Sequence, residues 1–175
     1  MKIKREYARA AAAAEQLMSE IEPYCERIEV AGSLRRHKPE IGDIEIVAIA
    51  KPLLNLFGEP TEGNEIDSWL YQRSIATTKN GSKYKQFEYE HEGERYQVDL
   101  FLAQPDNFGL IHMIRTGSAE FSKRMMTAQS YAGYLPAGLR VAEGHCWRNG
   151  AMVAVESEAD LFALWNMATV APEDR

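Results

Sequence analysis

The sequence is poor in the residues that build thiolate and imidazole metal sites. Its two cysteines, Cys25 and Cys146, stand far apart, and its four histidines lack the spacing of a helical metal-binding pair. Two isolated cysteines indicate reduced thiols rather than a disulfide framework, so we expect an intracellular protein. These shortages exclude a disulfide-rich secreted module and a cysteine- or histidine-based zinc site.

Long apolar runs are also missing. No stretch reaches transmembrane length, and residues 1–5 lead directly into an alanine-rich segment rather than into the apolar core of a signal peptide. We therefore expect no membrane partner. With 175 residues, 45% of them hydrophobic, the chain is long enough for one domain or for two closely packed subdomains with a real core.

Basic charge is the third shortage. The chain has 20 lysine and arginine residues against 26 aspartate and glutamate residues, which gives a formal net charge of −6. Stand-alone nucleic-acid binders are usually basic. If this chain binds a nucleic acid, the affinity should be local, modest and strongly dependent on salt, or a partner protein should deliver the chain to its target.

Two carboxylates stand two residues apart at the start of a β-branched segment. Asp43 and Glu45 open residues 43–50, which predict a strand. Because side chains alternate between the two faces of a strand, both acids should point to one face while Ile44 and Ile46 point into a core. Adjacent carboxylates repel each other unless a cation lies between them, and a hard divalent cation such as Mg²⁺ prefers oxygen ligands.

A third acid occurs in another segment with the composition of a strand. Asp99 is the only carboxylate in the middle of residues 95–102, which are rich in aromatic and β-branched side chains. A buried aspartate needs a partner. If this strand pairs with the strand of Asp43 and Glu45, three acids converge, and three carboxylates can hold two metal ions for an in-line displacement at phosphorus.

A short turn precedes the first two acids. The backbone N–H groups of Gly32-Ser33 and the Ser33 hydroxyl can bind terminal phosphate oxygens, and Arg36 can add charge-assisted hydrogen bonds. Taken alone, this pair is equally typical of an ordinary strand-to-helix turn; the acids that follow at a fixed distance favour phosphate binding. Arg35 is open to a second interpretation, an ion pair with Glu40 or another acid.

Periodicity and turn residues predict the remaining elements. We expect helices over residues 5–24, 65–75, 107–115, 119–132 and 158–167, the last with Ser157 as its N-cap. We expect further strands over residues 27–31, 85–91, 94–103, 139–142, 145–148 and 151–155, a turn-rich connection over 51–65, and a hairpin turn at Asn80-Gly81.

Several motifs together resemble the nucleotidyltransferases of the DNA polymerase β type, family X. In family order they are Gly32-Ser33-x-Arg-Arg, Gly42-Asp-x-Glu, Val98-Asp-Leu, Asn107-Phe-Gly, Arg115-Thr-Gly-Ser and Phe121, then residues 155–162 and 172–175. The chain is similar to the reduced viral members, which dispense with the amino-terminal DNA-binding modules. The resemblance implies an α/β (α+β) fold: a catalytic palm with a mixed or antiparallel sheet over residues 1–104, then a small C-terminal α/β nucleotide-binding subdomain over 105–175.

The resemblance also implies roles for the candidate site residues. Asp43, Glu45 and Asp99 would be the catalytic residues and the ligands of two Mg²⁺ ions. Glu45 replaces the aspartate usual at its position, which keeps Mn²⁺ open as the alternative to Mg²⁺. The residues expected to bind the nucleotide are Gly32, Ser33, Arg36, Gly42, Arg115, Gly117, Ser118 and Ser122. The residues expected to contact DNA phosphates are Lys79, Lys83, Lys85 and Lys123, although a solvated turn explains the first three equally well.

The surroundings of the site depart from the family pattern. Gln97 and Phe101 stand where well-studied members carry arginines that tune the third acid. Ile114 and Arg115 replace two residues that are usually aromatic and that shape sugar discrimination, so sugar selectivity stays open. Arg115 is either a phosphate or base contact or a cation at a helix end. The family's turn also implies a cis peptide bond between residues 117 and 118.

We interpret the chain as an enzyme, a DNA-directed DNA polymerase that adds deoxynucleotides to a 3′-hydroxyl by a two-metal mechanism, in gap filling or DNA repair and with low fidelity. Its expected partners are gapped or nicked primer–template DNA and nucleoside triphosphates, and we expect a monomer. Two alternatives stay open. The first is a template-independent transferase that acts on RNA, a protein or a small molecule, which the acidic charge and the Ile114-Arg115 pair support. The second is a non-enzymatic module that binds nucleic-acid ends, and the three acids argue against it.

Overall fold

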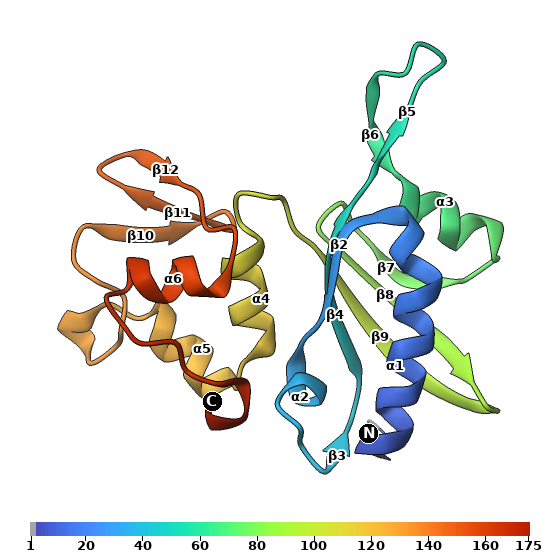
Figure 1. The fold of residues 1–175 in the computed structure, drawn as a ribbon, viewed down its shortest axis with the longest axis horizontal. Coiled ribbons are helices and arrows are strands. Elements are labelled where there is room, and N and C mark those ends of the chain that lie inside the picture. The colour runs from blue at the N-terminus through green and yellow to red at the C-terminus, as the bar shows by residue number, and fades with distance from the viewer. Residues whose placement is uncertain (1–2) are drawn as a thin grey trace.

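A mixed five-stranded sheet forms the centre of the computed structural model, which describes residues 3–175 (Figure 1). The strand order is β2-β4-β9-β8-β7; β4 and β9 are parallel, and the other neighbours are antiparallel. The strands are β2 (Cys25–Val30), β4 (Ile44–Ala50), β9 (Glu94–Leu102), β8 (Tyr84–His91) and β7 (Thr77–Asn80). The predicted α/β fold with a mixed sheet is confirmed, and so is the pairing of the two strands associated with the acids.

Two helices, α1 (Tyr7–Ile21) and α3 (Glu65–Gln72), pack on one face of this sheet (Figure 1). The buried residues of α1 recur at helical spacing, from Ala10 through Leu17 to Ile21, so the helix turns one apolar stripe toward the strands. Alternate residues of β4 and β9, such as Ile44 and Val98, meet this stripe and are fully buried. Burial of this apolar surface is the main stabilising contribution to this part of the chain.

The opposite face of the sheet, here called the acid face, carries Glu45 and Asp99. Because side chains alternate along β4 and β9, these acids lie on the face of the sheet that points away from the core residues. A smaller apolar cluster on the acid face includes Val47 and Phe101, and Phe108 joins it from α4 (Phe108–Thr116). Helix α4 therefore covers part of the face on which the acids lie.

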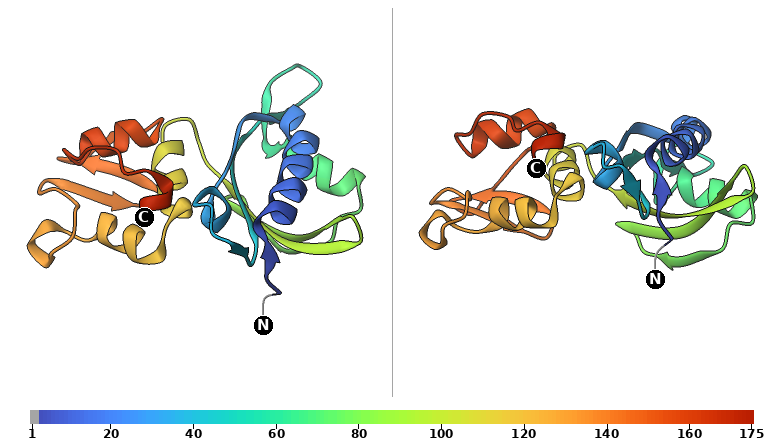
Figure 2. Two further views of the ribbon diagram at one scale, coloured as in Figure 1. Left: turned by 60° about the horizontal axis from the view of Figure 1, so that its bottom comes forward. Right: turned by 90° about the horizontal axis from the view of Figure 1, so that it is seen from below.

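A second hydrophobic core lies in the C-terminal part of the chain, beside the large sheet (Figure 2). Its buried residues run from Leu110 to Trp165. Most of them come from α4, from the helices α5 (Ala119–Met126) and α6 (Glu158–Leu164), and from the strands β10 (Leu139–Ala142) and β11 (His145–Arg148). These two strands form an antiparallel sheet with β12 (Ala151–Val153). The boundary between residues 104 and 105 stays a prediction, and residues 1 and 2 of the first predicted unit lie outside the described residues.

Several helix ends differ from the sequence prediction. The first helix begins only after β1 (Arg5–Glu6), because that strand pairs with β3 (Glu40–Ile41), and it ends before a 3₁₀ turn at Glu22–Tyr24. Helix α5 stops at Met126 instead of continuing to residue 132, because the chain folds back over its end. The N–H of Tyr134 donates to the carbonyl of Arg124 at 2.8 Å. Ser157 caps α6 as predicted, with a reciprocal hydrogen-bonded capping box.

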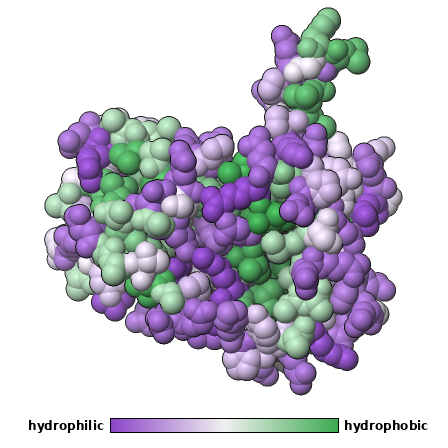
Figure 3. Space-filling model, in the orientation of Figure 1, coloured by the Kyte–Doolittle hydropathy of each residue, from purple (hydrophilic) through white to green (hydrophobic). Residues whose placement is uncertain are grey.

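The predicted turn-rich connection forms a projecting hairpin of two short strands, β5 (Pro52–Leu54) and β6 (Pro60–Asn64). Asn55 closes its tip, because its side-chain oxygen accepts the N–H of Phe57 at 2.9 Å and the N–H of Glu59 at 3.0 Å. Hydrophobic residues lie beside hydrophilic ones on this projection (Figure 3), and Leu56 and Phe57 at its tip are exposed. Among residues 3–175, no helix combines the length and the apolarity needed to cross a membrane.

Gly109 sits where α4 passes the start of α6. A Cβ atom at Gly109 would lie 2.1 Å from the backbone oxygen of Ser157, so backbone atoms would have to move. We expect Gly109→Ala to lower the free energy of unfolding by about 1–3 kcal/mol, measured by urea denaturation. The control is Gly81→Ala, where the nearest atom to the added Cβ, the oxygen of Tyr84, lies at 3.4 Å. Equal losses in both variants would contradict the proposed close contact.

Candidate active site

A one-turn helix, α2 (Gly32–Arg35), joins β2 to the loop that leads to the acids. Gly32 has a φ of +62°, and a Cβ atom there would lie 1.9 Å from Oε2 of Glu45. Glycine is therefore required twice, for the backbone conformation and for the space that the Glu45 carboxylate fills. The Ala31 N–H donates to the carbonyl of Glu45 at 2.8 Å, which fixes the turn against β4.

The three predicted acids lie within electrostatic reach of one another. Glu45 is directly opposite Asp99 in the register of β4 and β9, and Asp43 immediately precedes β4. Burial, followed by the nearby carboxylates of Asp43 and Asp99, raises the pKa of Glu45 to about 7. Arg115 and Arg36 act in the opposite sense. The structure thus brings together acids that the sequence places 54 residues apart, from Glu45 to Asp99.

The donor set of this acid group fits a hard divalent cation. Three carboxylates supply only oxygen ligands, and a cation among them would relieve the repulsion that raises the pKa of Glu45. Over residues 3–175, however, no three His, Cys, Asp or Glu side chains are already close enough to form a metal-binding group. Ion binding at these acids would therefore require their side chains to move closer together.

Asp99 is buried, and neutral side chains hydrogen-bond to it. Its Oδ1 accepts the Tyr84 hydroxyl at 2.6 Å and Nε2 of Gln86 at 2.8 Å. Gln97, at a position where the resemblance leads us to expect arginine, reaches Oδ2 at 3.2 Å. The sequence analysis missed Tyr84 and Gln86. Their positions two residues apart on a strand beside Asp99 were the available signal, but it could be used only after the strand pairing was known.

Arg115 lies over the ring of Phe101, with its guanidinium carbon 3.9 Å from the ring centre. It comes from the end of α4, whereas Phe101 belongs to β9, so this cation–π contact joins the two parts of the chain. Both residues line a cleft of about 480 Å³, together with Tyr84, Lys83 and His145. Arg115 is thus a cation beside the acid group rather than an isolated charge at a helix end.

Arg36 links the turn to the predicted Thr116-Gly117-Ser118 motif. Its Nη1 donates to the carbonyl of Thr116, and a Cβ at Gly117 would lie 2.8 Å from the same nitrogen. Burial lowers the pKa of Arg36. The peptide bond between Gly117 and Ser118 is cis, which confirms that expectation. Ser118 caps α5, since its hydroxyl oxygen accepts the N–H of Phe121 at 3.4 Å.

Two predicted contact residues are not available to a ligand. Ser122 is buried and donates its hydroxyl to the carbonyl of Ile114 at 2.9 Å, so its expected role in nucleotide binding is corrected. Lys85 is 1% exposed and donates to Asp67 of α3 and to Asn80, so its expected DNA contact is corrected as well. Lys85 faces the core side of β8, where a lysine needs acceptors. The other predicted DNA contacts, Lys79, Lys83 and Lys123, are exposed.

Arg35 pairs with an acid, but not with Glu40. It donates to both carboxylate oxygens of Glu158 at 2.7 and 2.9 Å, and Arg175 donates to the same oxygens at 2.7 and 3.0 Å. Burial alone would raise the pKa of Glu158, but the hydrogen bonds from Arg175 and Arg35 lower it to about 2. The bidentate contact of Arg35 joins the turn to the start of α6, and that of Arg175 joins the last residue to the same carboxylate.

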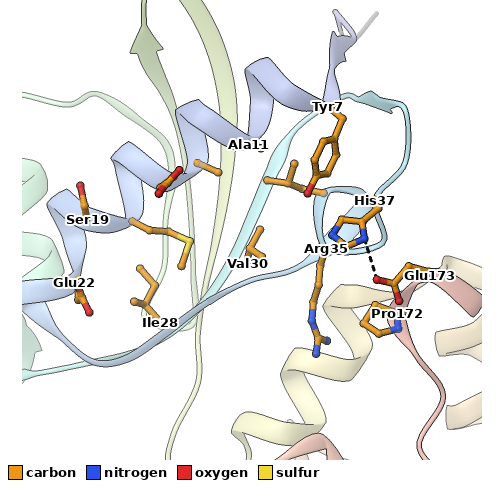
Figure 4. A pocket seen from close by; sticks show the side chains of 14 residues that line it. Tyr7, Ala11, Ser19, Glu22, Ile28, Val30, Arg35, His37, Pro172 and Glu173 are labelled. Atoms are coloured by element: carbon orange, nitrogen blue, oxygen red, sulfur yellow. Dashed lines mark ion pairs between the residues drawn. The ribbon is translucent and has the colours of Figure 1, made fainter.

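A groove of about 610 Å³ lies between α1 and the α2 turn (Figure 4). It is lined mostly by apolar side chains such as Met18 and Ile28, and an ion pair between His37 and Glu173 lies at one end. Asp43, Glu45 and Asp99 are not among its lining residues. This groove is therefore separate from the acid group.

The fold is shared with a polymerase. A crystal structure of Leishmania infantum polymerase beta in a ternary P/T complex matches this chain with a TM-score of 0.76 and 17% sequence identity, over 99% of this chain and 77% of that chain. At this identity the likeness shows the fold alone. It confirms, at the level of fold, the resemblance to the polymerase β type. No protein-family model and no curated protein matches the sequence.

The raised pKa of Glu45 predicts a cost in stability that depends on pH. Its folded pKa of about 7 exceeds the ordinary value of 4.5, so the folded state binds the proton more tightly and stability falls as the pH rises through this interval. Without divalent ions, we expect Glu45→Gln to raise the free energy of unfolding by up to about 3 kcal/mol at pH 8 and by much less at pH 5.

Urea denaturation at both pH values measures this effect. Glu88→Gln, which removes an exposed carboxylate on β8, is the matched control and should change stability little at either pH. A gain for Glu45→Gln that is the same at pH 5 and pH 8 would show that the ionisation of Glu45 is not its source.

Proposed function

We propose that this chain is a metal-dependent nucleotidyltransferase, and specifically a DNA-directed DNA polymerase that extends a 3′-hydroxyl. The observation that carries the proposal is the strand register that sets Glu45 beside Asp99. Asp43 immediately precedes the same strand, and the turn at Gly32 packs against the Glu45 side chain. The fold shared with polymerase beta supports it. Residues 1–104 would form the catalytic part and residues 105–175 the nucleotide-binding part.

The turn and its arginine would bind the triphosphate. The N–H groups of Gly32 and Ser33 lie at the start of α2, and the Ser33 hydroxyl would add a donor. The Nε of Arg36 is buried and has no hydrogen-bond partner among the described residues, so a phosphate oxygen would satisfy it. Gly42, Gly117 and Ser118 would complete the nucleotide site beside this arginine.

The acids would carry the chemistry. Asp43, Glu45 and Asp99 would hold two Mg²⁺ or Mn²⁺ ions, which supply Lewis-acid stabilisation of the developing negative charge when bound. Asp99 would accept the proton of the 3′-hydroxyl while the oxygen of that hydroxyl attacks the α-phosphorus and pyrophosphate leaves. Glu45 must lose its proton to act as a ligand, so the affinity of the nucleotide-free protein for a divalent ion should increase as the pH rises toward about 7.

Nucleic-acid affinity would come from a few exposed lysines. Lys79 and Lys83 lie on or beside the β7–β8 hairpin, and Lys123 lies on α5. Their contacts would be to phosphates, which position a duplex without reading its sequence. Because the net charge is −6, binding should be modest and should weaken steeply with added salt.

Extension of a labelled primer on one-nucleotide-gapped DNA tests the proposal. Each deoxynucleotide is supplied singly, first with Mg²⁺ and then with Mn²⁺, and Asp99→Asn is the inactive control. We expect incorporation directed by the template base, with misinsertion, and a loss of about 10²–10⁴-fold in the variant.

Addition that ignores the template base would replace the polymerase proposal with a template-independent transferase. No addition with either metal, on gapped, nicked or recessed DNA, would refute the polymerase proposal. Chelation of divalent ions should abolish any genuine incorporation, so activity that survives chelation would contradict the role given to the acids.

A further inference from the structure

The two shortest hydrogen bonds to Asp99 both go to one of its two carboxylate oxygens, Oδ1. We propose that Tyr84 and Gln86 are positioning residues that fix Asp99 through Oδ1 and thereby leave Oδ2 as the oxygen that meets the metal ion or the 3′-hydroxyl. This inference rests on the proposed function and deepens it. It assigns a role to two residues of β8 that belong to none of the sequence motifs described above.

Strand pairing sets this arrangement. Gln86 is directly opposite Asp99 in the antiparallel register of β8 and β9, and Tyr84 is opposite Phe101. Because Tyr84 and Gln86 are two residues apart, their side chains lie on the same face of the sheet as Asp99. Both can therefore reach the carboxylate without any displacement of the backbone.

The hydrogen bonds are distributed unequally between the two oxygens. Oδ1 accepts from Tyr84 at 2.6 Å and from Gln86 at 2.8 Å, with a longer approach of Gln97 at 3.4 Å. Oδ2 accepts from Gln97 at 3.2 Å. A carboxylate oxygen has two lone pairs. Oδ1 is thus occupied by its neighbours, whereas Oδ2 keeps capacity for a further partner.

The Tyr84 hydroxyl is itself fixed. It accepts Nε2 of Gln86 at 3.0 Å, and its ring stacks on that of Phe101 with 4.9 Å between the ring centres. Phe101 in turn lies beneath Arg115. The Tyr84 hydroxyl thus has one partner that accepts its proton, Asp99, and one that donates to it, Gln86.

The donors to Asp99 are neutral, which matters for a metal ligand. A lysine or arginine bonded to this carboxylate would repel an approaching divalent cation, whereas a phenol and an amide orient the carboxylate without adding positive charge. Gln97, at the position where the resemblance predicts arginine, is consistent with the same arrangement. Tyr84 and Gln86 therefore orient Asp99 without placing a positive charge on the carboxylate that would meet the metal ion.

The test uses Tyr84→Phe, which removes the hydroxyl but keeps the ring on Phe101, and Gln86→Met, which removes the amide at similar volume. Tyr89→Phe is the matched control, because Tyr89 lies on the same strand but donates to Glu20 at 2.9 Å, away from Asp99. Two quantities are measured: single-nucleotide incorporation, as kcat and nucleotide KM, and Mn²⁺ affinity of the nucleotide-free protein by electron paramagnetic resonance.

We expect Tyr84→Phe and Gln86→Met each to lower kcat about 10- to 100-fold and to weaken Mn²⁺ binding, with nucleotide KM within about threefold of wild type. Tyr89→Phe should match wild type in both measurements. Wild-type kcat and wild-type Mn²⁺ affinity in both site variants would overturn the inference. Circular dichroism checks that each variant is folded, and either variant alone is sufficient for the test.

The two proposals fail in different ways. If the wild-type protein incorporates no nucleotide with either metal, the polymerase proposal is lost, but the Mn²⁺ titration still decides whether Tyr84 and Gln86 orient Asp99. If the wild-type protein is active and the site variants match it in kcat and Mn²⁺ affinity, the polymerase proposal stands and the positioning role is wrong.

Discussion

The parallel pairing of β4 with β9 is the contact on which the rest of the site depends. It sets Glu45 opposite Asp99 and turns both away from the core that Ile44 and Val98 enter on the other face. A slip of one residue in either strand would bury its acid against α1 and expose its core residues, at a large cost in apolar burial. The hydrophobic core therefore enforces the position of the acids.

That position is unfavourable for the isolated chain. Burial and the nearby carboxylates raise the pKa of Glu45 to about 7. The folded protein therefore favours the protonated, neutral form of this side chain more than the unfolded chain does. Gly32 leaves room for the Glu45 side chain, and the neutral side chains of Tyr84 and Gln86 satisfy Asp99. The fold thus keeps an acid group that only a cation would stabilise fully.

Contacts between the two parts of the chain converge on the same place. Arg35 bonds Glu158 of α6, Arg36 bonds the carbonyl of Thr116, and Arg115 of α4 stacks on Phe101 of β9. Each contact joins the turn or the acid face to the C-terminal part. Any movement of that part relative to the sheet would have to change these contacts together.

The sequence alone determined the elements whose signal is local. Alternation along residues 43–50 put Asp43 and Glu45 on one face, and Ser157 capped its helix, because each depends only on near neighbours in the chain. The tertiary structure decided what depends on pairing between distant segments: the buried Lys85 and Ser122, the partner of Arg35, and the donors to Asp99. Strand register and helix packing bring these groups together, and no local pattern encodes which distant residue will lie opposite.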